Sequence, residues 1–320
     1  SQAVTDLGYV NGKVLVAGGS HSYVRSENIT QTAFLYDPET GDIEVLSSQQ
    51  DLKKPRYLHR AVTNSQGDVV VIGGFGRVEP NFLFAEVTFE IYSANDQDFA
   101  RPVDLQAAAL YGMAVALGTQ GVVYCGGGAL AGGSTWVPDA RCVQISLAGE
   151  LSTVFEDLPV PLSHASLVAL DEDRLLMTGG VTSDVSVEQT AALSALDRAF
   201  VYTPEDGWRE IQGMSQARAR HASVLLPSGE VLILGGVTNS GLQFLNDING
   251  DTLACAEIFD PVTETFSPVD SCSADHNSAT LPTRMSDIDL AQDPDFGILL
   301  AGGLDGDSSL QSTALWAPAP

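Results

Sequence analysis

Short apolar runs that end in a pair of glycines recur along the whole chain. The runs are KVLVAGG, DVVVIGG, GVVYCGG, RLLMTGG, EVLILGG and GILLAGG, with their first glycines at positions 18, 73, 126, 179, 235 and 302. The steps between these glycines are 55, 53, 53, 56 and 67 residues. A fixed period of about 50 residues with strand signals is typical of a repeat whose unit is a small β-sheet. Because one such sheet cannot bury both faces alone, we expect neighbouring copies to pack face to face.

Each repeat shows the pattern of four antiparallel strands. A first apolar strand is expected at 59–65, 111–117, 164–170 and 221–227, and a tight turn joins it to the run that ends in Gly-Gly. These two strands are apolar throughout, which predicts cover on both faces. A longer loop follows, and the Gly-rich stretch 126–133 is interpreted as part of such a loop. The third strand ends in an aromatic residue and a turn, and the fourth strand follows.

The last repeat differs from the others in length. Its strands are expected at 277–281, 297–301 and 313–316, and an acidic insertion at 285–295 accounts for the step of 67 residues. The chain reaches Pro320 before a fourth strand can form. Either this last unit has three strands, or a segment before Ser1 supplies the fourth.

The motifs of the repeat resemble the kelch-repeat family, in particular its secreted bacterial members. The residues that carry the resemblance are the six glycine pairs, the segment 218–236, Trp208 and the aromatics Tyr36, Tyr92, Tyr202 and Phe259. Residues 145–155 depart from the pattern, and most tryptophans common in the fourth strand are missing. The resemblance implies an all-β, six-bladed β-propeller with four-stranded antiparallel blades, the last blade being complete or incomplete. We expect one domain over 1–320, with blades at about 1–50, 51–104, 105–158, 159–213, 214–270 and 271–320.

Charge and composition restrict the partners. The net charge is −26, from 41 acidic and 15 basic residues. Binding to phosphates requires a positive surface, so nucleic acids are excluded as expected partners. No apolar run reaches 18 residues, so we expect no transmembrane segment.

The four cysteines are expected to pair within blades. The repeat places Cys125 opposite Cys142 and Cys255 opposite Cys272, and four buried thiols are the alternative. Two disulfides would indicate an oxidising compartment, so we expect a secreted, periplasmic or cell-surface protein.

Basic residues suggest a binding face. In kelch-type propellers, the loops from strand two to three and from strand four to one share a face, and most of the 15 basic residues fall on these loops. Arginine binds carboxylates, sulfates and phosphates through its planar fork. The tentative ligand-binding residues on this face are Arg25, Arg56, Arg77, Arg220, Tyr23 and Trp136. In the alternative interpretation, the arginines neutralise nearby acidic residues and the aromatics pack loops together.

Histidines and acidic residues provide weaker candidates. Four histidines precede or begin first strands, where they would surround the mouth of the channel: His59, His164, His221 and His276. Such imidazoles bind metals or ligands, or hydrogen-bond to neighbouring backbone. Asp247, Asn249 and Asp251 are weak calcium candidates, with solvated loops as the alternative. No other cofactor is expected.

Two functions compete at this stage. The first is a non-enzymatic binding protein, a monomer or weak homodimer, that recognises a protein, a glycan or an anionic ligand through the loop face. The alternative is a sugar-active enzyme resembling the kelch propellers that interconvert or epimerise sialic acid. No nucleophile or nucleotide-binding motif is present, and no catalytic residue is assigned.

Overall fold

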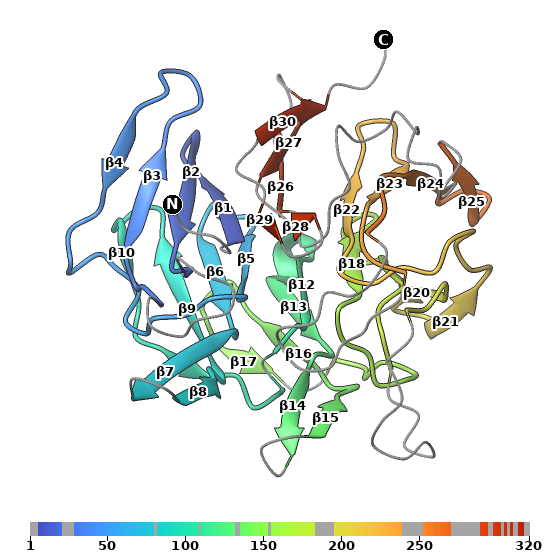
Figure 1. The fold of residues 1–320 in the computed structure, drawn as a ribbon, viewed down its shortest axis with the longest axis horizontal. Helices are drawn as coiled ribbons and strands as arrows, with labels where there is room; N and C mark the ends of the chain where they lie inside the picture. Colours follow the sequence, from blue (N-terminus) through green and yellow to red (C-terminus); the bar gives the residue numbers. More distant parts are fainter. Residues whose placement is uncertain are drawn as a thin grey trace. The chain divides into compact units, whose positions relative to one another are not determined.

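The computed structural model describes residues 6–20, 29–79, 82–108, 110–131, 135–152, 155–182, 195–238, 252–269 and, near the carboxyl end, 289–293, 297–301, 304–305, 308–309 and 313–316. These residues form β-strands and one short 3-10 helix, η2 (Gly118–Gln120) (Figure 1). Within these ranges, none of the helices has the length and apolar character needed to span a bilayer. The chain divides into two compact units, Ser1–Ser163 and His164–Pro320.

The first unit contains three repeated sheets. Blade 1 consists of β1 (Asp6–Val10), β2 (Lys13–Ala17), β3 (Ala33–Tyr36) and β4 (Ile43–Val45). Blade 2 consists of β5 (Arg60–Thr63), β6 (Val69–Ile72), β9 (Thr88–Ser93), β10 (Asp98–Phe99) and β11 (Val103–Asp104). Blade 3 consists of β12 (Met113–Ala116), β13 (Val122–Cys125), β16 (Cys142–Ile145) and β17 (Leu151–Ser152). Two separate hairpins are β7 (Phe75–Glu79) with β8 (Phe82–Ala85), and β14 (Gly128–Ala131) with β15 (Thr135–Pro138).

The second unit repeats the same design. Blade 4 consists of β18 (Ser166–Ala169), β19 (Leu175–Thr178), β20 (Ala199–Thr203) and β21 (Gly207–Ile211). Blade 5 consists of β22 (Ala222–Leu225), β23 (Val231–Leu234), β24 (Ala256–Asp260) and β25 (Thr265–Pro268). Blade 6 consists of β26 (Asp289–Asp293), β27 (Gly297–Ala301) and β30 (Thr313–Trp316). A small hairpin pairs β28 (Leu304–Asp305) with β29 (Ser308–Ser309).

All strand pairs are antiparallel, and in each blade the strand order follows the chain from the inner strand outward. The hairpin turn between β1 and β2 shows how the sequence sets this order. Asn11 and Gly12 both have positive φ, at +50° and +79°, as a two-residue hairpin turn requires. The six sheets match the six repeats and confirm the predicted propeller blades. That the two units form a single domain stays a prediction.

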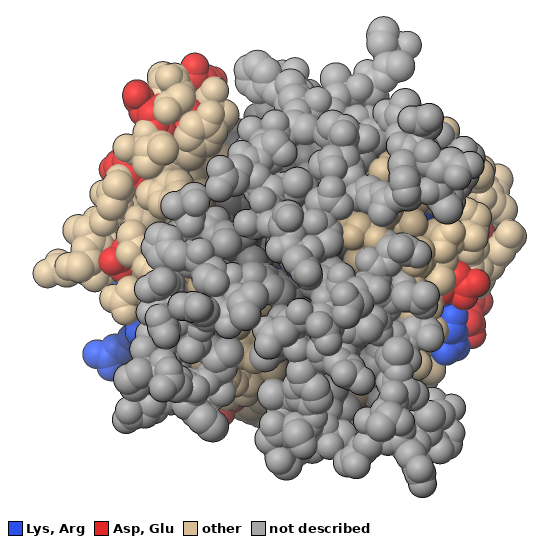
Figure 2. Space-filling model, viewed as in Figure 1, with Lys and Arg blue, Asp and Glu red and all other residues tan. Residues whose placement is uncertain are grey.

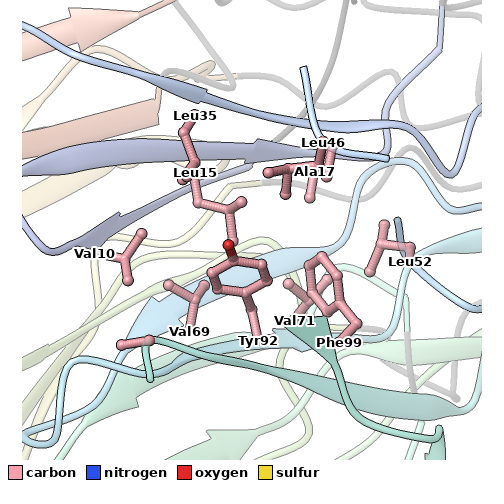
Figure 3. Close-up of a cluster of buried hydrophobic side chains, with 12 residues drawn as sticks. Val10, Leu15, Ala17, Leu35, Leu46, Leu52, Val69, Val71, Tyr92 and Phe99 are labelled. Carbon is pink, nitrogen blue, oxygen red and sulfur yellow. The ribbon is translucent and has the colours of Figure 1, made fainter. Parts of the chain in front are cut away.

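Neighbouring blades within a unit pack face to face. Val69 and Val71 of β6 point toward blade 1 and join a cluster with Leu15 and Leu35 (Figure 3). Val70, from the opposite face of β6, joins a second cluster with residues of blade 3. The second strand is therefore covered on both faces, as its unbroken apolar run predicted.

The aromatic residue of the third strand pairs with the fourth strand. Tyr92 lies opposite Phe99, with ring centroids 5.1 Å apart, and both rings belong to the buried cluster in Figure 3. Phe259 lies opposite Phe266 in blade 5, at 4.9 Å. In these two blades, the aromatic pair packs in the outer part of the hydrophobic core.

Two expectations about loops were wrong. The Gly-rich stretch 126–133 contains strand β14, because it folds back on β15 as a hairpin. In blade 6 the first strand is β26 at Asp289–Asp293, inside the segment interpreted as an acidic insertion, and the predicted 277–281 lies outside the described residues. In blades 1 to 5 a tight turn joins the first strand to the second. The same short spacing in blade 6 favours a first strand at 289–293 over one at 277–281.

Candidate functional site

The linker that leads into an inner strand rests on the glycine pair of the preceding blade. The N–H of Gly19 donates to the carbonyl oxygen of Arg56 at 2.7 Å, and Gly180 does the same to Arg218 at 2.9 Å. A Cβ atom on Gly18 would lie 2.6 Å from the Arg56 oxygen, closer than side chains allow, and its φ is +68°. The glycine pair therefore gives the next linker room to approach.

Arg56, a predicted ligand-binding residue, is fully buried in blade 2. Its Nη2 lies 2.6 Å from Oε1 of Glu90, and neither side chain is exposed. Nη1 donates to the carbonyl oxygens of Gly73 at 3.0 Å and Thr88 at 2.9 Å. Glu90 also accepts the backbone N–H of Lys53 at 2.6 Å. The guanidinium is therefore held in the interior, where it fixes the linker to the sheet and does not face a surface ligand.

Arg218 and Glu257 form the same arrangement in blade 5. Their Nη2 and Oε1 atoms lie 2.8 Å apart, and both side chains are fully buried. Arg218 donates to the carbonyl oxygen of Gly235 at 2.8 Å, and Glu257 accepts the N–H of Ser215 at 2.7 Å. Burial lowers the pKa of Arg218, while the charge of Glu257 acts in the opposite direction. We call these two contacts the buried Arg–Glu pairs.

Other basic residues of the predicted binding face are neutralised by acidic neighbours. These ion pairs are Lys53–Asp98 at 3.0 Å, Arg141–Asp139 at 2.6 Å and Arg198–Glu210 at 2.6 Å. In the view of Figure 2, basic side chains of described residues show at only a few places, and at the right edge they lie beside acidic ones. For these three residues the structure supports the alternative interpretation, local charge neutralisation.

His59 and His221 occupy equivalent positions, each directly before an inner strand. The Nε2 atom of His221 lies 2.9 Å from Oγ1 of Thr178 in blade 4, so this imidazole links two blades. His59 is 3% exposed. Burial lowers the pKa of His59 to about 3, and the charges of Arg56 and Arg60 act in the same direction. Both rings are therefore packed between blades, and His59 is neutral at physiological pH.

His164 belongs to a different position of the repeat. It has a φ of +57°, as Arg220 has, and Leu58 and Tyr111 share this left-handed conformation in their linkers. The N–H of Arg220 donates to the carbonyl oxygen of His164 at 2.8 Å, and both residues are buried. His276 lies outside the described residues. Four histidines were expected at equivalent positions of the repeat. In the described part of the chain, two of them, His59 and His221, occupy such positions.

An aromatic group lies where blades 2 and 3 meet. Phe75, at the start of β7, stacks at a tilt on Tyr57 with centroids 5.4 Å apart. Tyr111, from the linker of blade 3, meets the same Phe75 edge-on at 6.0 Å. Tyr57 and Phe75 are buried, whereas Tyr111 is half-buried. The sequence alone could not place Tyr111 beside Phe75, because the two residues come from different blades.

The hairpins β7–β8 and β14–β15 extend the loops between the second and third strands of blades 2 and 3, and both lie at the lower end of the view in Figure 1. Arg77 lies in β7 and Trp136 in β15; their side chains are outside the described part. The predicted disulfide between Cys125 and Cys142 is confirmed, and it joins directly opposed residues at the base of β14–β15.

The remaining candidates cannot be placed. Cys255 is disulfide-bonded, and its predicted partner Cys272 lies outside the described residues. Five other candidates also lie outside the described residues: Tyr23, Arg25, Asp247, Asn249 and Asp251. Within the described ranges, no three His, Cys, Asp or Glu side chains gather closely enough to hold a metal ion.

Comparisons with known proteins support the fold. No family model matches the chain, and no curated protein matches its sequence. Among solved structures, the chain is similar to YjhT, with a TM-score of 0.65 and 13% sequence identity. The match covers 83% of this chain and 84% of YjhT. At this identity the likeness concerns the fold alone: together with the six repeated antiparallel sheets, it shows an all-β β-propeller.

Proposed function

We propose that this chain is a non-enzymatic, extracytoplasmic propeller of the secreted bacterial kelch type, which binds a glycan or protein ligand through the loops between strands two and three and between strands four and one. The observation that carries the proposal is the pair of ordered hairpins, β7–β8 and β14–β15, added to neighbouring blades. Blades 2 and 3 form sheets of five and four strands without these hairpins. Ordered additions on a repeated scaffold are where binding sites are commonly built.

Two features favour these hairpins as a recognition surface. The disulfide Cys125–Cys142 closes the loop that contains β14–β15, which limits its motion and so lowers the entropic cost of binding. Val137 of β15 and Val87, just after β8, are 43% and 44% exposed. Exposed apolar side chains on an ordered hairpin are suited to contact with a partner or with the apolar face of a sugar.

The disulfide supports the proposed location. Disulfides persist in oxidising compartments, so one within a blade supports a secreted, periplasmic or cell-surface protein. The net charge of −26 gives strong self-repulsion between copies, which favours a monomer.

The resemblance of the repeats to kelch propellers that interconvert sialic acid keeps a sugar-active enzyme as the second candidate. Such an enzyme requires an acidic residue and an arginine that reach a ligand. The two buried Arg–Glu pairs have this composition, but neither side chain in them is exposed. Arg198, on the predicted binding face, is paired with Glu210 through two hydrogen bonds, at 2.6 and 2.8 Å. Binding without catalysis therefore has more support.

The proposal is tested on the full chain with arrays of glycans and of extracellular proteins. Trp136→Ala and Val137→Ser alter β15, whereas Val262→Ser alters a turn residue that is 89% exposed at the outer edge of blade 5. We expect binding to fall in the first two variants and to stay unchanged in the third. Equal binding by all three variants, or no ligand on any array, would overturn the proposal.

A further inference from the structure

Arg60 is the first residue of β5, the inner strand of blade 2. Its side chain is half-buried, and its Nε donates to the carbonyl oxygen of Gly112 at 3.1 Å. Gly112 directly precedes β12, the inner strand of blade 3, which contacts β5 (Figure 1). This bond fixes the guanidinium at the junction of the two inner strands.

No described carboxylate forms an ion pair with Arg60. Eight other basic side chains each have a carboxylate oxygen at 2.6 to 3.0 Å. In a chain with a net charge of −26, a half-buried arginine without an acidic partner is the exception. Among the described groups whose pKa is clearly shifted, His59 and Tyr124 sense the charge of Arg60. The pKa of His59 is lowered to about 3 and burial raises that of Tyr124, so both are neutral at physiological pH.

The hydrogen-bonding capacity of Arg60 is only partly used. A guanidinium has five N–H donors in a planar fork. The bond to Gly112 uses Nε, and no further hydrogen bond of Arg60 to a described residue is present. Two terminal nitrogens therefore remain, which is the geometry that binds a carboxylate through two parallel hydrogen bonds.

An aromatic residue directly precedes the glycine that accepts the hydrogen bond of Arg60. Tyr111 precedes Gly112 in the chain, and its φ of +55° turns the backbone at this point. Its half-buried ring is supported edge-on by Phe75, which rests on Tyr57. A site that combines a supported aromatic ring with a guanidinium offers a ligand both an apolar and a charged contact.

We propose that Arg60 and Tyr111 form a binding site for a sugar acid, in which the arginine binds the carboxylate and the tyrosine contacts the ring of the sugar. This inference rests on the proposed binding function and names its ligand class. In the buried Arg–Glu pairs, an ion pair would have to break before the arginine could bind a ligand. Arg60 forms no ion pair with a described residue, so its charge is available to a ligand.

The test measures binding of glucuronate to the full chain by isothermal titration calorimetry, with glucose as the uncharged control. We expect glucuronate to bind more tightly than glucose. Arg60→Gln keeps a donor for Gly112 but removes the charge, and it should weaken glucuronate binding by about tenfold or more, the effect of losing a charge-assisted bidentate contact. Arg60→Lys keeps the charge without the fork and should give an intermediate loss. Arg101→Gln removes a charge from an exposed arginine and should leave binding within about twofold of wild type.

Several results would overturn the inference. These are equal affinity for glucuronate and glucose, an Arg60→Gln variant that binds as wild type does, or an equal loss in Arg101→Gln. Thermal melting of each variant shows whether it is folded. The array experiment with the β15 variants separates the two proposals: an array ligand that depends on Trp136 but not on Arg60 would retain the binding function and reject the sugar-acid site.

Discussion

In blade 2 the linker residue that rests on the preceding glycine pair is Arg56, and the third-strand residue two positions before the aromatic is Glu90. At the same two positions of the repeat, blade 4 has Leu162 and Phe200. All four side chains are buried. The repeat thus accepts a charged pair in one blade and apolar residues in another, so the charges are not required for the fold as such.

This difference explains why counting basic residues on loops overestimates a binding face. Arg56 and Arg218 lie on the loops that the sequence assigned to ligands, yet both are neutralised inside a blade. Arg60 is only four residues from Arg56 but has no described acidic partner. Removing one member of a buried pair should be costly, whereas changing Arg60 should affect a ligand and leave the fold intact.

The largest effect is expected from Glu90→Ala. This change leaves Arg56 charged and buried without its partner, and it removes an acceptor from the N–H groups of Lys53 and Lys54. The free energy of unfolding, measured by urea denaturation, should fall by about 3–5 kcal/mol. The control is Glu44→Ala, which breaks an exposed ion pair with Lys13 and should cost about 1 kcal/mol or less. Equal losses in both variants would show that burial of the pair has no special role.

The second-largest loss of stability is expected from removal of the disulfide in blade 3. Blades 2 and 4 have Ile72–Phe89 and Thr178–Ala199 where blade 3 has Cys125–Cys142. Replacing both cysteines by alanine opens a loop with a sequence separation of 17 and should lower the free energy of unfolding by about 3 kcal/mol. Addition of a reductant to the wild type should give a similar loss. An unchanged denaturation midpoint in both experiments would show that the hairpin base is held by packing alone.

His59 gives a pH-dependent effect of similar or smaller size. Its pKa is about 3 in the folded protein against 6.5 ordinarily, so the unfolded chain binds the proton first as the pH falls. The stabilisation is therefore present above pH 6.5 and is lost between pH 6.5 and 3. By pH 4 the loss should reach up to about 3 kcal/mol more in the wild type than in His59→Leu. Parallel pH profiles of the two proteins would contradict the assignment.

The smallest net change is expected when blade 2 receives the residues of blade 4. Arg56→Leu combined with Glu90→Phe removes both charges together, so no unpaired charge stays buried. The double variant should unfold within about 2 kcal/mol of wild type and be more stable than Glu90→Ala. A double variant less stable than the single one would show that the Arg–Glu pair is specific to the shape of blade 2.

The sequence predicted the repeat and its strands well because glycine pairs and apolar runs report local backbone geometry. It missed strand β26 and hairpin β14–β15, where Gly, Asp and small residues hide a strand that long-range pairing stabilises. The buried Arg–Glu pairs left a signal that could have been found. Arg-x-x-His occurs at 56–59 and 218–221, and Glu-Ile-aromatic at 90–92 and 257–259, in the same two repeats. The group formed by Arg60, Gly112 and Tyr111 left none, because it depends on how two blades meet.

The central claim is that Arg56 serves the fold and Arg60 serves a ligand. The most direct test compares Arg56→Gln with Arg60→Gln in two measurements on each protein, the free energy of unfolding and the affinity for glucuronate. The structure predicts that Arg56→Gln loses stability and that Arg60→Gln keeps its stability but loses glucuronate binding. An Arg56→Gln variant as stable as wild type, or an Arg60→Gln variant that binds glucuronate normally, would contradict it.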